Sequence, residues 1–247
     1  RANLMHPRTA ISTAVRKVLG SVTHVVTDES VAALTFDDGP DSQSTPLVLA
    51  LLEKYHARGT FFLVGEAAAT QPDLVRRITA GGHAIGLHSW DHRAFPCLSS
   101  RERRRQIRAC ERVLGSHAAR LFRPPYGEQT MSSRLEALLL GYEVVGWNVN
   151  SGDWYESDPA ALSRYLLGSL EPGAIILLHD TLFDKGAPAH GIDPEHRSWP
   201  DRQAMLQALE ALLEQSTGRY RFVTVPELLR SGTPRRSFWF KSSLAKS

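Results

Sequence analysis

The sequence predicts an α/β protein in which parallel strands curl into a closed or nearly closed barrel. Short apolar runs alternate with helical patterns from about residue 31 to residue 229, which is typical of a parallel sheet connected by helices. About seven such units follow one another in 247 residues, a usual length for a single α/β barrel. An open, doubly wound sheet is the alternative, but no glycine-rich phosphate-binding pattern follows the first strand.

We expect the individual helices and strands where the hydrophobic pattern agrees with the positions of Gly, Pro and capping residues. Residues 11–27 are interpreted as a short helix or an extended lead-in. Pro72 suits the first turn of a helix, where its missing N–H does no harm, and Ser99 can cap an arginine-rich helix. The expected strands are 31–36, 61–65, 83–87, 121–122, 142–149, 174–178 and 221–225. The expected helices are 45–55, 71–80, 100–114, 132–140, 158–170, 201–215 and 226–229, and residues 181–200 are expected to form a loop.

Composition and charge exclude some classes of function. Apolar residues make up 42% of the chain, enough for a sizeable core, and no run approaches the ~18 residues of a membrane span. The net charge of +3 gives no electrostatic argument for nucleic acid as a partner. The arginines of residues 101–108 are interpreted as the solvated face of a helix. Cys97 and Cys110 fit neither a disulfide framework nor a thiolate metal pattern, and their pairing is left open.

Chemically active side chains follow the expected strands, at the points where these strands end. The carboxyl ends of parallel barrel strands open onto one face, so we expect the side chains to meet in one cleft. Alone, each signal also has a plain structural interpretation, such as a turn for Asp-Gly-Pro or a hydrogen-bonding role for a lone histidine. The joint pattern is difficult to explain in that way. It consists of Asp37 and Asp38 in TFDDGP, His88 and His92 in HSWDH, Arg123 and Tyr126 in RPPYG, Asp153 and Trp154 in SGDW, and His179 in LLHD.

The adjacent Asp37 and Asp38 would repel each other, and a bound cation would relieve that repulsion. Two imidazoles and one carboxylate are a common Zn²⁺ ligand set that leaves positions open for water and substrate. The two aspartates cannot easily bind the same ion, so one is expected to ligate it while its neighbour takes a proton from the metal-bound water. A backbone N–H beside the Pro124–Pro125 turn can stabilise an oxyanion, and His179, held by Asp153, suits the general acid.

These five motifs resemble those of the polysaccharide deacetylase family, the enzymes with a NodB-homology domain that form carbohydrate esterase family four. The resemblance covers residues 31–230, and TFDDGP followed about fifty residues later by H-x-x-x-H is a highly specific combination. It implies a distorted (β/α) barrel similar to a TIM barrel, often with seven strands. It also implies metal-dependent removal of acetyl groups, usually from N-acetylglucosamine or related sugars in a polymer. The chain is accordingly divided into a lead-in segment (1–30), the catalytic domain (31–230) and a tail (231–247).

The resemblance implies a role for the residues of the first three motifs. Asp37 resembles the general base, and Arg123 resembles the residue that pairs with it. Asp38, His88 and His92 resemble the metal ligands. Zinc suits this set of ligands best, while Co²⁺, Ni²⁺ or Mn²⁺ are alternatives.

The remaining site residues are also assigned by this resemblance. His179 resembles the general acid, oriented by Asp153. Tyr126 resembles the residue whose backbone N–H helps to form the oxyanion hole, and Pro125 precedes it in the same substrate-binding turn. Trp154 and Leu177 resemble the apolar walls around the acetyl methyl group.

Two positions depart from the family pattern. The fourth motif often begins with Asp, where this chain has Asn150, and many members have Asn where this chain has Leu87. The first change matters little if Asp153 is the important carboxylate of its motif. The change at Leu87 affects the hydrogen bonds that can orient the metal ligands.

Alternatives remain to the removal of N-acetyl groups from an acetylated glycan or amino sugar. The same barrel and ion suit an O-acetyl esterase acting on xylan-like glycans, or a hydrolase of small-molecule amides, because the cleft walls set the choice. A non-catalytic glycan-binding module would be expected to lack the base, the acid or a metal ligand, and all are present here. The resemblance favours an extracytoplasmic or cell-envelope location, although the first residues lack a hydrophobic signal core. The glycan and the oligomeric state are not set by the sequence.

Overall fold

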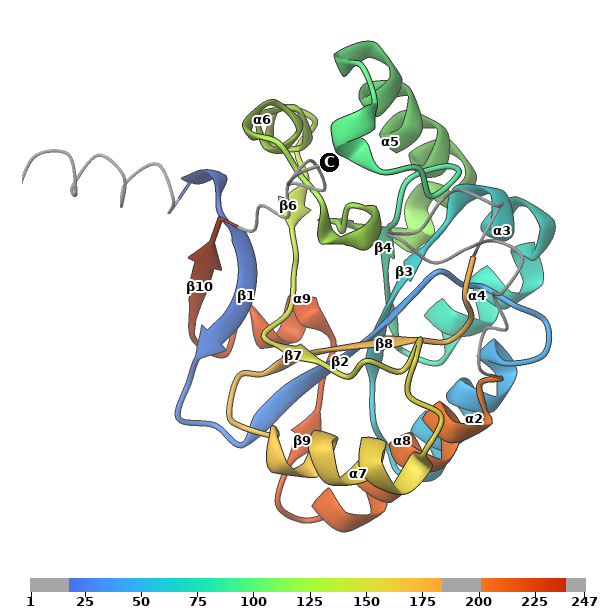
Figure 1. Cartoon of the computed structure of the whole chain (residues 1–247), viewed down its shortest axis with the longest axis vertical. Coiled ribbons are helices and arrows are strands. Elements are labelled where there is room, and N and C mark those ends of the chain that lie inside the picture. Colours follow the sequence, from blue (N-terminus) through green and yellow to red (C-terminus); the bar gives the residue numbers. More distant parts are fainter. Residues whose placement is uncertain (1–17, 184–200, 239–247) are drawn as a thin grey trace, which may run out of the picture.

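A parallel sheet of seven strands, curled into a half-barrel, forms the centre of the structure (Figure 1). The computed structural model describes residues 18–183 and 201–238. All pairings between neighbours in this sheet are parallel. The α/β barrel prediction is confirmed, but the described strands leave the barrel open, because its two edge strands do not pair with each other. The strand order is β6 (Glu143–Val144), β5 (Ala118–Phe122), β4 (Ala84–Leu87), β3 (Gly59–Leu63), β2 (Val31–Asp37), β8 (Ile175–His179) and β7 (Val149–Asn150).

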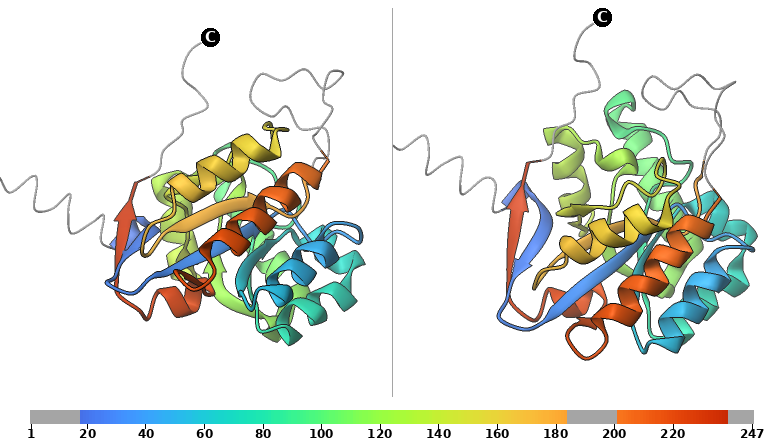
Figure 2. Two further views of the ribbon diagram at one scale, coloured as in Figure 1. Left: turned by 90° about the horizontal axis from the view of Figure 1, so that it is seen from below. Right: turned by 60° about the horizontal axis from the view of Figure 1, so that its bottom comes forward.

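Helices follow most strands, and α8 lies between α7 and α2 along one side of the sheet (Figure 2). Ser99 caps α5 as predicted, in a reciprocal capping box with Glu102, and Pro72 begins α4. The short helix α3 was not predicted, because Gly65 was assigned to the preceding strand. The helices are α2 (Thr45–Lys54), α3 (Gly65–Thr70), α4 (Pro72–Ala80), α5 (Ser100–Leu114), α6 (Met131–Leu139), α7 (Pro159–Gly168), α8 (Gln203–Ser216) and α9 (Val225–Leu228). In the described part of the chain, no helix is long and apolar enough to cross a bilayer.

A separate antiparallel pair joins β1 (Ser21–Val26) to β10 (Thr233–Ser237), two segments from opposite ends of the described chain. The interpretation of residues 11–27 left helix and extended chain open, and residues 21–26 are a strand. This strand covers the opening of the half-barrel: the Gly146 N–H donates to the Val22 carbonyl at 2.7 Å, and the Val25 N–H donates to the Gly173 carbonyl at 3.0 Å. The remaining strand, β9 (Arg221–Phe222), pairs with the beginning of β2.

The single strand expected over residues 142–149 is wrong, because β6 and β7 are two short strands separated by a crossing segment. The carbonyls of Val145 and Gly146 in that segment accept hydrogen bonds from the buried Arg123 guanidinium at 3.2 and 2.8 Å. The backbone of residues 145–146 therefore forms hydrogen bonds with the Arg123 side chain and with strand β1. It does not continue the sheet ladder from β6 to β7.

Residues alternate along the strands between two apolar clusters, as the two-residue period of a strand requires. In β2, Ala32, Leu34 and Phe36 belong to the larger cluster under the helices, whereas Val31 and Ala33 belong to the cluster inside the half-barrel. The same alternation places Thr35 and Asp37 toward the inside. Strand β2 therefore places the carboxylate of Asp37 inside the half-barrel, at the carboxyl end of the strand.

The interpretation of residues 101–108 as a solvated face is wrong for Arg103. Its side chain is buried and forms a two-point contact with the carboxylate of Glu136, with Nε–Oε2 and Nη2–Oε1 distances of 2.8 and 2.9 Å. This buried pair joins α5 to α6. Both cysteines are free, Cys97 exposed and Cys110 buried, and burial raises the pKa of the Cys110 thiol to about 12.

Candidate active site

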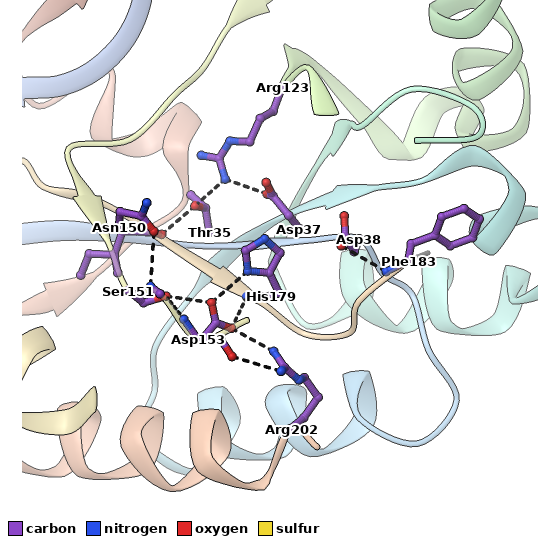
Figure 3. Close-up of polar contacts among 12 residues, drawn as sticks. Thr35, Asp37, Asp38, Arg123, Asn150, Ser151, Asp153, His179, Phe183 and Arg202 are labelled. Carbon is purple, nitrogen blue, oxygen red and sulfur yellow. Dashed lines mark hydrogen bonds and ion pairs between the residues drawn. The ribbon is translucent and has the colours of Figure 1, made fainter. Parts of the chain in front are cut away.

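The candidate site lies at the carboxyl ends of the strands, where the sequence motifs converge (Figure 3). Asp37 and His179 end two neighbouring strands, β2 and β8, and are partners in register. Asp38 follows at the next position, and His88 follows the end of β4. Parallel strands in register therefore bring residues that are more than a hundred positions apart onto one edge of the sheet.

Asp38, His88 and His92 form a buried group whose ligand atoms all lie within 4.8 Å of one another. The Asp38 Oδ1 atom lies 3.1 Å from His92 Nε2 and 3.5 Å from His88 Nε2. Burial alone would raise the pKa of Asp38, but the charge of His92 and the contact with His88 hold that pKa well below its ordinary value. The Asp38 Oδ1 atom accepts no hydrogen bond of good geometry from the described residues, as expected of an oxygen positioned to bind a cation. The three residues fit a divalent metal ion.

His88 is fixed in the tautomer that metal binding needs. Its Nδ1 atom lies 2.7 Å from the backbone carbonyl of Arg123, and since a carbonyl can only accept, Nδ1 carries the proton. The Nε2 lone pair therefore points toward Asp38. The departure at Leu87 does not disturb this contact, because the Leu87 side chain is buried in the apolar core under the helices.

Asp37 is held by Arg123, a guanidinium with no exposed surface. The Nη1 atom of Arg123 donates to Asp37 Oδ1 at 2.7 Å and to the Thr35 hydroxyl at 2.8 Å. The guanidinium also stacks over the Phe62 ring, with its carbon 4.1 Å from the ring centroid. The other Asp37 oxygen, Oδ2, lies 3.7 Å from His88 Nε2 and so faces the candidate metal group.

On the opposite side, Asp153 holds His179. The two oxygens of Asp153 receive the ring Nδ1 and the backbone N–H of His179, each at 2.9 Å. Burial would lower the pKa of His179, but the charge of Asp153, with smaller contributions from Asp38 and Asp37, raises it to about 9. This raised pKa favours the protonated imidazole at neutral pH. Asn150, the departure in the fourth motif, is exposed, and its side-chain oxygen accepts from the Gly152 N–H at 3.3 Å.

Arg202 is a site residue that sequence reasoning missed. Its Nη1 and Nη2 atoms donate to Asp153 Oδ2 and to the Asp153 backbone carbonyl, both at 3.1 Å. Burial would raise the pKa of Asp153, but His179 and Arg202 together hold it below its ordinary value. Arg202 stands at the beginning of α8, outside all five motifs, so no local pattern indicated it.

Asp180 and Phe183 also contact the site and were not predicted. The buried Asp180 carboxylate accepts from the Thr45 hydroxyl, and burial raises its pKa to about 7. A Cβ at Gly39 would overlap the carboxylate of Asp180, which explains the glycine in TFDDGP. The Phe183 backbone N–H donates to Asp38 Oδ2 at 3.1 Å and orients that carboxylate.

The turns that carry the site contain several non-glycine residues in the left-handed backbone region. The φ angles are 78° at Asp38, 69° at Ser89, 60° at His92 and 59° at Tyr126. Such conformations are unfavourable for residues with a Cβ and collect at functional sites, where surrounding contacts enforce them. These strained conformations indicate that the surrounding structure holds the side chains of the site in position.

The predicted substrate-binding residues lie around His92 and His179. The Tyr126 ring packs on His92 with 4.6 Å between centroids, and the Trp154 ring meets the His179 ring edge-on at 5.3 Å. Leu177 is 2% exposed and belongs to the apolar cluster inside the half-barrel, and Pro125 is buried. Residues 184–200, most of the loop expected over residues 181–200, lie outside the described residues.

Proteins of similar sequence identify the family to which this fold and site belong. Residues 24–145 match the family model described as polysaccharide deacetylase. A peptidoglycan-N-acetylglucosamine deacetylase of Bacillus cereus is 32% identical over 213 residues, covering 85% of this chain and 72% of the relative. A chitooligosaccharide deacetylase of Azorhizobium caulinodans is 33% identical over 199 residues, covering 79% of this chain and 90% of the relative. The chain belongs to the polysaccharide deacetylase family, also called carbohydrate esterase family four.

Solved structures agree with this membership. A peptidoglycan N-acetylglucosamine deacetylase in complex with 4-naphthalen-1-yl-N-oxidanyl-benzamide superposes with a TM-score of 0.76 and 31% identity, covering 91% of this chain and 99% of the other. A family 4 carbohydrate esterase from Streptomyces lividans in complex with acetate gives a TM-score of 0.69 at 26% identity, covering 86% and 100% of the two chains.

Proposed function

We propose that this protein removes N-acetyl groups from N-acetylglucosamine-type sugars in a glycan. One observation supports the proposal above all: the Asp38–His88–His92 group is flanked by a carboxylate held by arginine and an imidazole held by a carboxylate. Asp37 and His179 thus have environments that suit opposite proton-transfer roles. The similarity to peptidoglycan and chitooligosaccharide deacetylases supports an N-acetylated amino sugar as the substrate.

Asp38, His88 and His92 would hold a divalent ion, with Zn²⁺ favoured by the His₂Asp donor set. When bound, such an ion polarises a carbonyl and lowers the pKa of water toward ~7. Asp37 takes the proton of the attacking water on Oδ2, the oxygen that faces the ligand group, while Arg123 keeps Oδ1 occupied. The arginine therefore prevents the base from rotating away from the reacting water.

His179 donates a proton from Nε2 to the departing amine, because its Nδ1 atom is engaged by Asp153. The Tyr126 backbone N–H contributes to the oxyanion hole, from a turn in which this residue adopts the left-handed conformation. Trp154, packed against His179, forms one wall for the acetyl methyl group.

Acetate release from a substrate panel tests the proposal. The panel contains chitooligosaccharides, peptidoglycan fragments and acetylated xylan, each with and without a chelator, and Asp37→Asn protein is the matched control. We expect chelator-sensitive release from N-acetylated substrates and almost none from the variant. Release from xylan alone would support the O-acetyl esterase instead. No release from any substrate by the zinc-loaded protein would leave a small-molecule amidase or a glycan-binding module.

A further inference from the structure

The charges of this chain are distributed unevenly along its sequence. Residues 1–27 contain four basic and no acidic side chains, and residues 230–247 contain five basic and no acidic ones. The whole chain has 29 basic and 26 acidic residues, so the part between these segments has 20 basic and 26 acidic ones. Two terminal segments with a combined charge of +9 therefore flank a domain with a charge of −6.

The fold brings the described parts of the two terminal segments together beside helix α6. Strands β1 and β10 pair with each other, and the buried Arg134 of α6 contacts the residues that flank them (Figure 1). Its Nη1 atom donates to the Leu19 carbonyl at 3.1 Å and to the Ser21 hydroxyl at 2.9 Å. Its guanidinium carbon lies 5.7 Å from the centroid of the Phe238 ring. The basic segments therefore enter the described structure next to α6.

The outward face of α6 is apolar. Its two charged residues, Arg134 and Glu136, are both buried. Four large apolar side chains are exposed instead, at the spacing i, i+4, i+7 and i+8 that lies along one face of a helix. They are Met131, Leu135, Leu138 and Leu139, the last of which is 76% exposed. We call these four residues the α6 face. A contiguous exposed apolar face of this kind marks an interaction surface.

The neighbouring charge indicates what this surface contacts. An apolar helix face beside basic segments suits an anionic bilayer, because the apolar side chains enter the boundary between headgroups and acyl chains while Lys and Arg meet the headgroups. A second copy of this chain would bring the like charges of the terminal segments together. Nucleic acid would meet the basic charge but would leave the α6 face in water. A lipid surface is therefore favoured over both.

We propose that the α6 face and the basic segments beside it dock this protein peripherally on an anionic lipid bilayer. The proposal does not depend on the proposed function. Helix α6 begins shortly after the RPPYG turn, so the docked surface adjoins the segment that carries Tyr126.

Co-sedimentation of the full chain with lipid vesicles tests the apolar part of the proposal. Vesicles of phosphatidylcholine alone are compared with vesicles that also contain phosphatidylglycerol. Leu135→Gln changes the α6 face, and Leu47→Gln on α2 is the matched control, since the two leucines are 46% and 47% exposed. We expect binding to the anionic vesicles only, weakened about fivefold by Leu135→Gln and unchanged by Leu47→Gln. Thermal melting of both variants verifies that each is folded.

The same assay tests the charges. Arg235→Gln/Lys241→Gln removes two basic residues of the C-terminal segment, and Arg164→Gln/Arg219→Gln removes two exposed arginines elsewhere on the chain. We expect the first double variant to weaken binding about tenfold and the second to leave it unchanged, because lipid attraction acts only on charges near the membrane surface. High salt should weaken the binding of the wild type in the same way.

Equal binding to neutral and anionic vesicles, or equal losses in a variant and its matched control, would overturn the proposal. Size-exclusion chromatography and binding of duplex DNA distinguish the other occupants. A dimer that Leu135→Gln dissociates, without any vesicle binding, would assign the α6 face to a second copy. Binding of DNA that Leu135→Gln does not change, again without vesicle binding, would assign the basic segments to a polyanion.

Discussion

The backbone carbonyl of Arg123 lies 2.7 Å from His88 Nδ1, while the guanidinium of the same residue lies 2.7 Å from Asp37 Oδ1. One buried residue thus orients a proposed metal ligand through its main chain and the proposed base through its side chain. Because a substitution removes the guanidinium but keeps the carbonyl, the two tasks can be separated by mutation.

Arg123→Met is expected to lower turnover while leaving metal affinity close to that of the wild type. The variant leaves the Asp37 charge buried without its partner, which costs about 3–5 kcal/mol of unfolding free energy. Urea unfolding and metal titration measure both effects. Arg103→Met is the control, since it breaks another buried pair, with Glu136, away from the candidate site. It should lose stability but keep kcat, and loss of metal in Arg123→Met would contradict the division of tasks.

Asp37→Asn should bind metal and lose about 10²–10⁴-fold in kcat, because the amide cannot accept the proton of the attacking water. Metal stoichiometry and acetate release on the same preparation provide the measurement. A variant with full activity would rule out Asp37 as the base.

His88→Ala should lose the metal, because Nε2 of this residue completes the three-ligand group. His117→Ala is the matched control, since His117 is exposed and far from the group in sequence. Elemental analysis after dialysis reports the result. If His88→Ala retains the metal at wild-type stoichiometry, His88 is not a ligand.

The pH profile of kcat should fall on its alkaline side as His179 loses its proton. The pKa of His179 is raised to about 9, so the acid is protonated and active below that value and inactive above it. A bound divalent ion repels the imidazolium, so the limb is expected at or below about pH 9. Asp153→Asn removes the charge that contributes most to raising this pKa, and the limb should move to lower pH. An unmoved limb would exclude His179 as the titrating acid.

Arg202→Gln is expected to move the same limb in the opposite direction. The Arg202 guanidinium partly neutralises Asp153, so its removal strengthens the field of that carboxylate on His179 and raises the His179 pKa. Arg202→Lys keeps the charge and should restore the wild-type profile. A limb that moves to lower pH in Arg202→Gln would mean that Arg202 acts by holding Asp153 in place.

The sequence was sufficient to predict those site residues that lie in recognisable motifs at the ends of apolar strands. The residues Asp38, His88 and His92 are brought together as expected, because each follows the end of a parallel strand or lies in the turn after it. The half-barrel and most helices were predictable for the same reason: strands buried on both faces, such as β2, are continuous apolar runs.

The sequence was insufficient where the deciding contact is distant and its residue type is common. Arg103 cannot be told from its exposed neighbours until α6 supplies Glu136, and Arg202 gains a role only when α8 reaches Asp153. The break between β6 and β7 arises because Arg123 and β1 use the intervening backbone. The roles of Asp37, Tyr126, Trp154 and Leu177 toward a substrate remain predictions.

The pairing of β1 with β10 determines how the fold responds to a pull on its ends. Ser21 and Ser237 are partners in register, so tension applied there would separate the two strands one hydrogen bond at a time from that end, like a zipper. The next residue, Val22, bonds to Gly146, whose carbonyl accepts from the Arg123 guanidinium beside Asp37. A protein or anchor attached to this strand pair is therefore connected to the candidate site through a short chain of hydrogen bonds, from Val22 through Gly146 and Arg123.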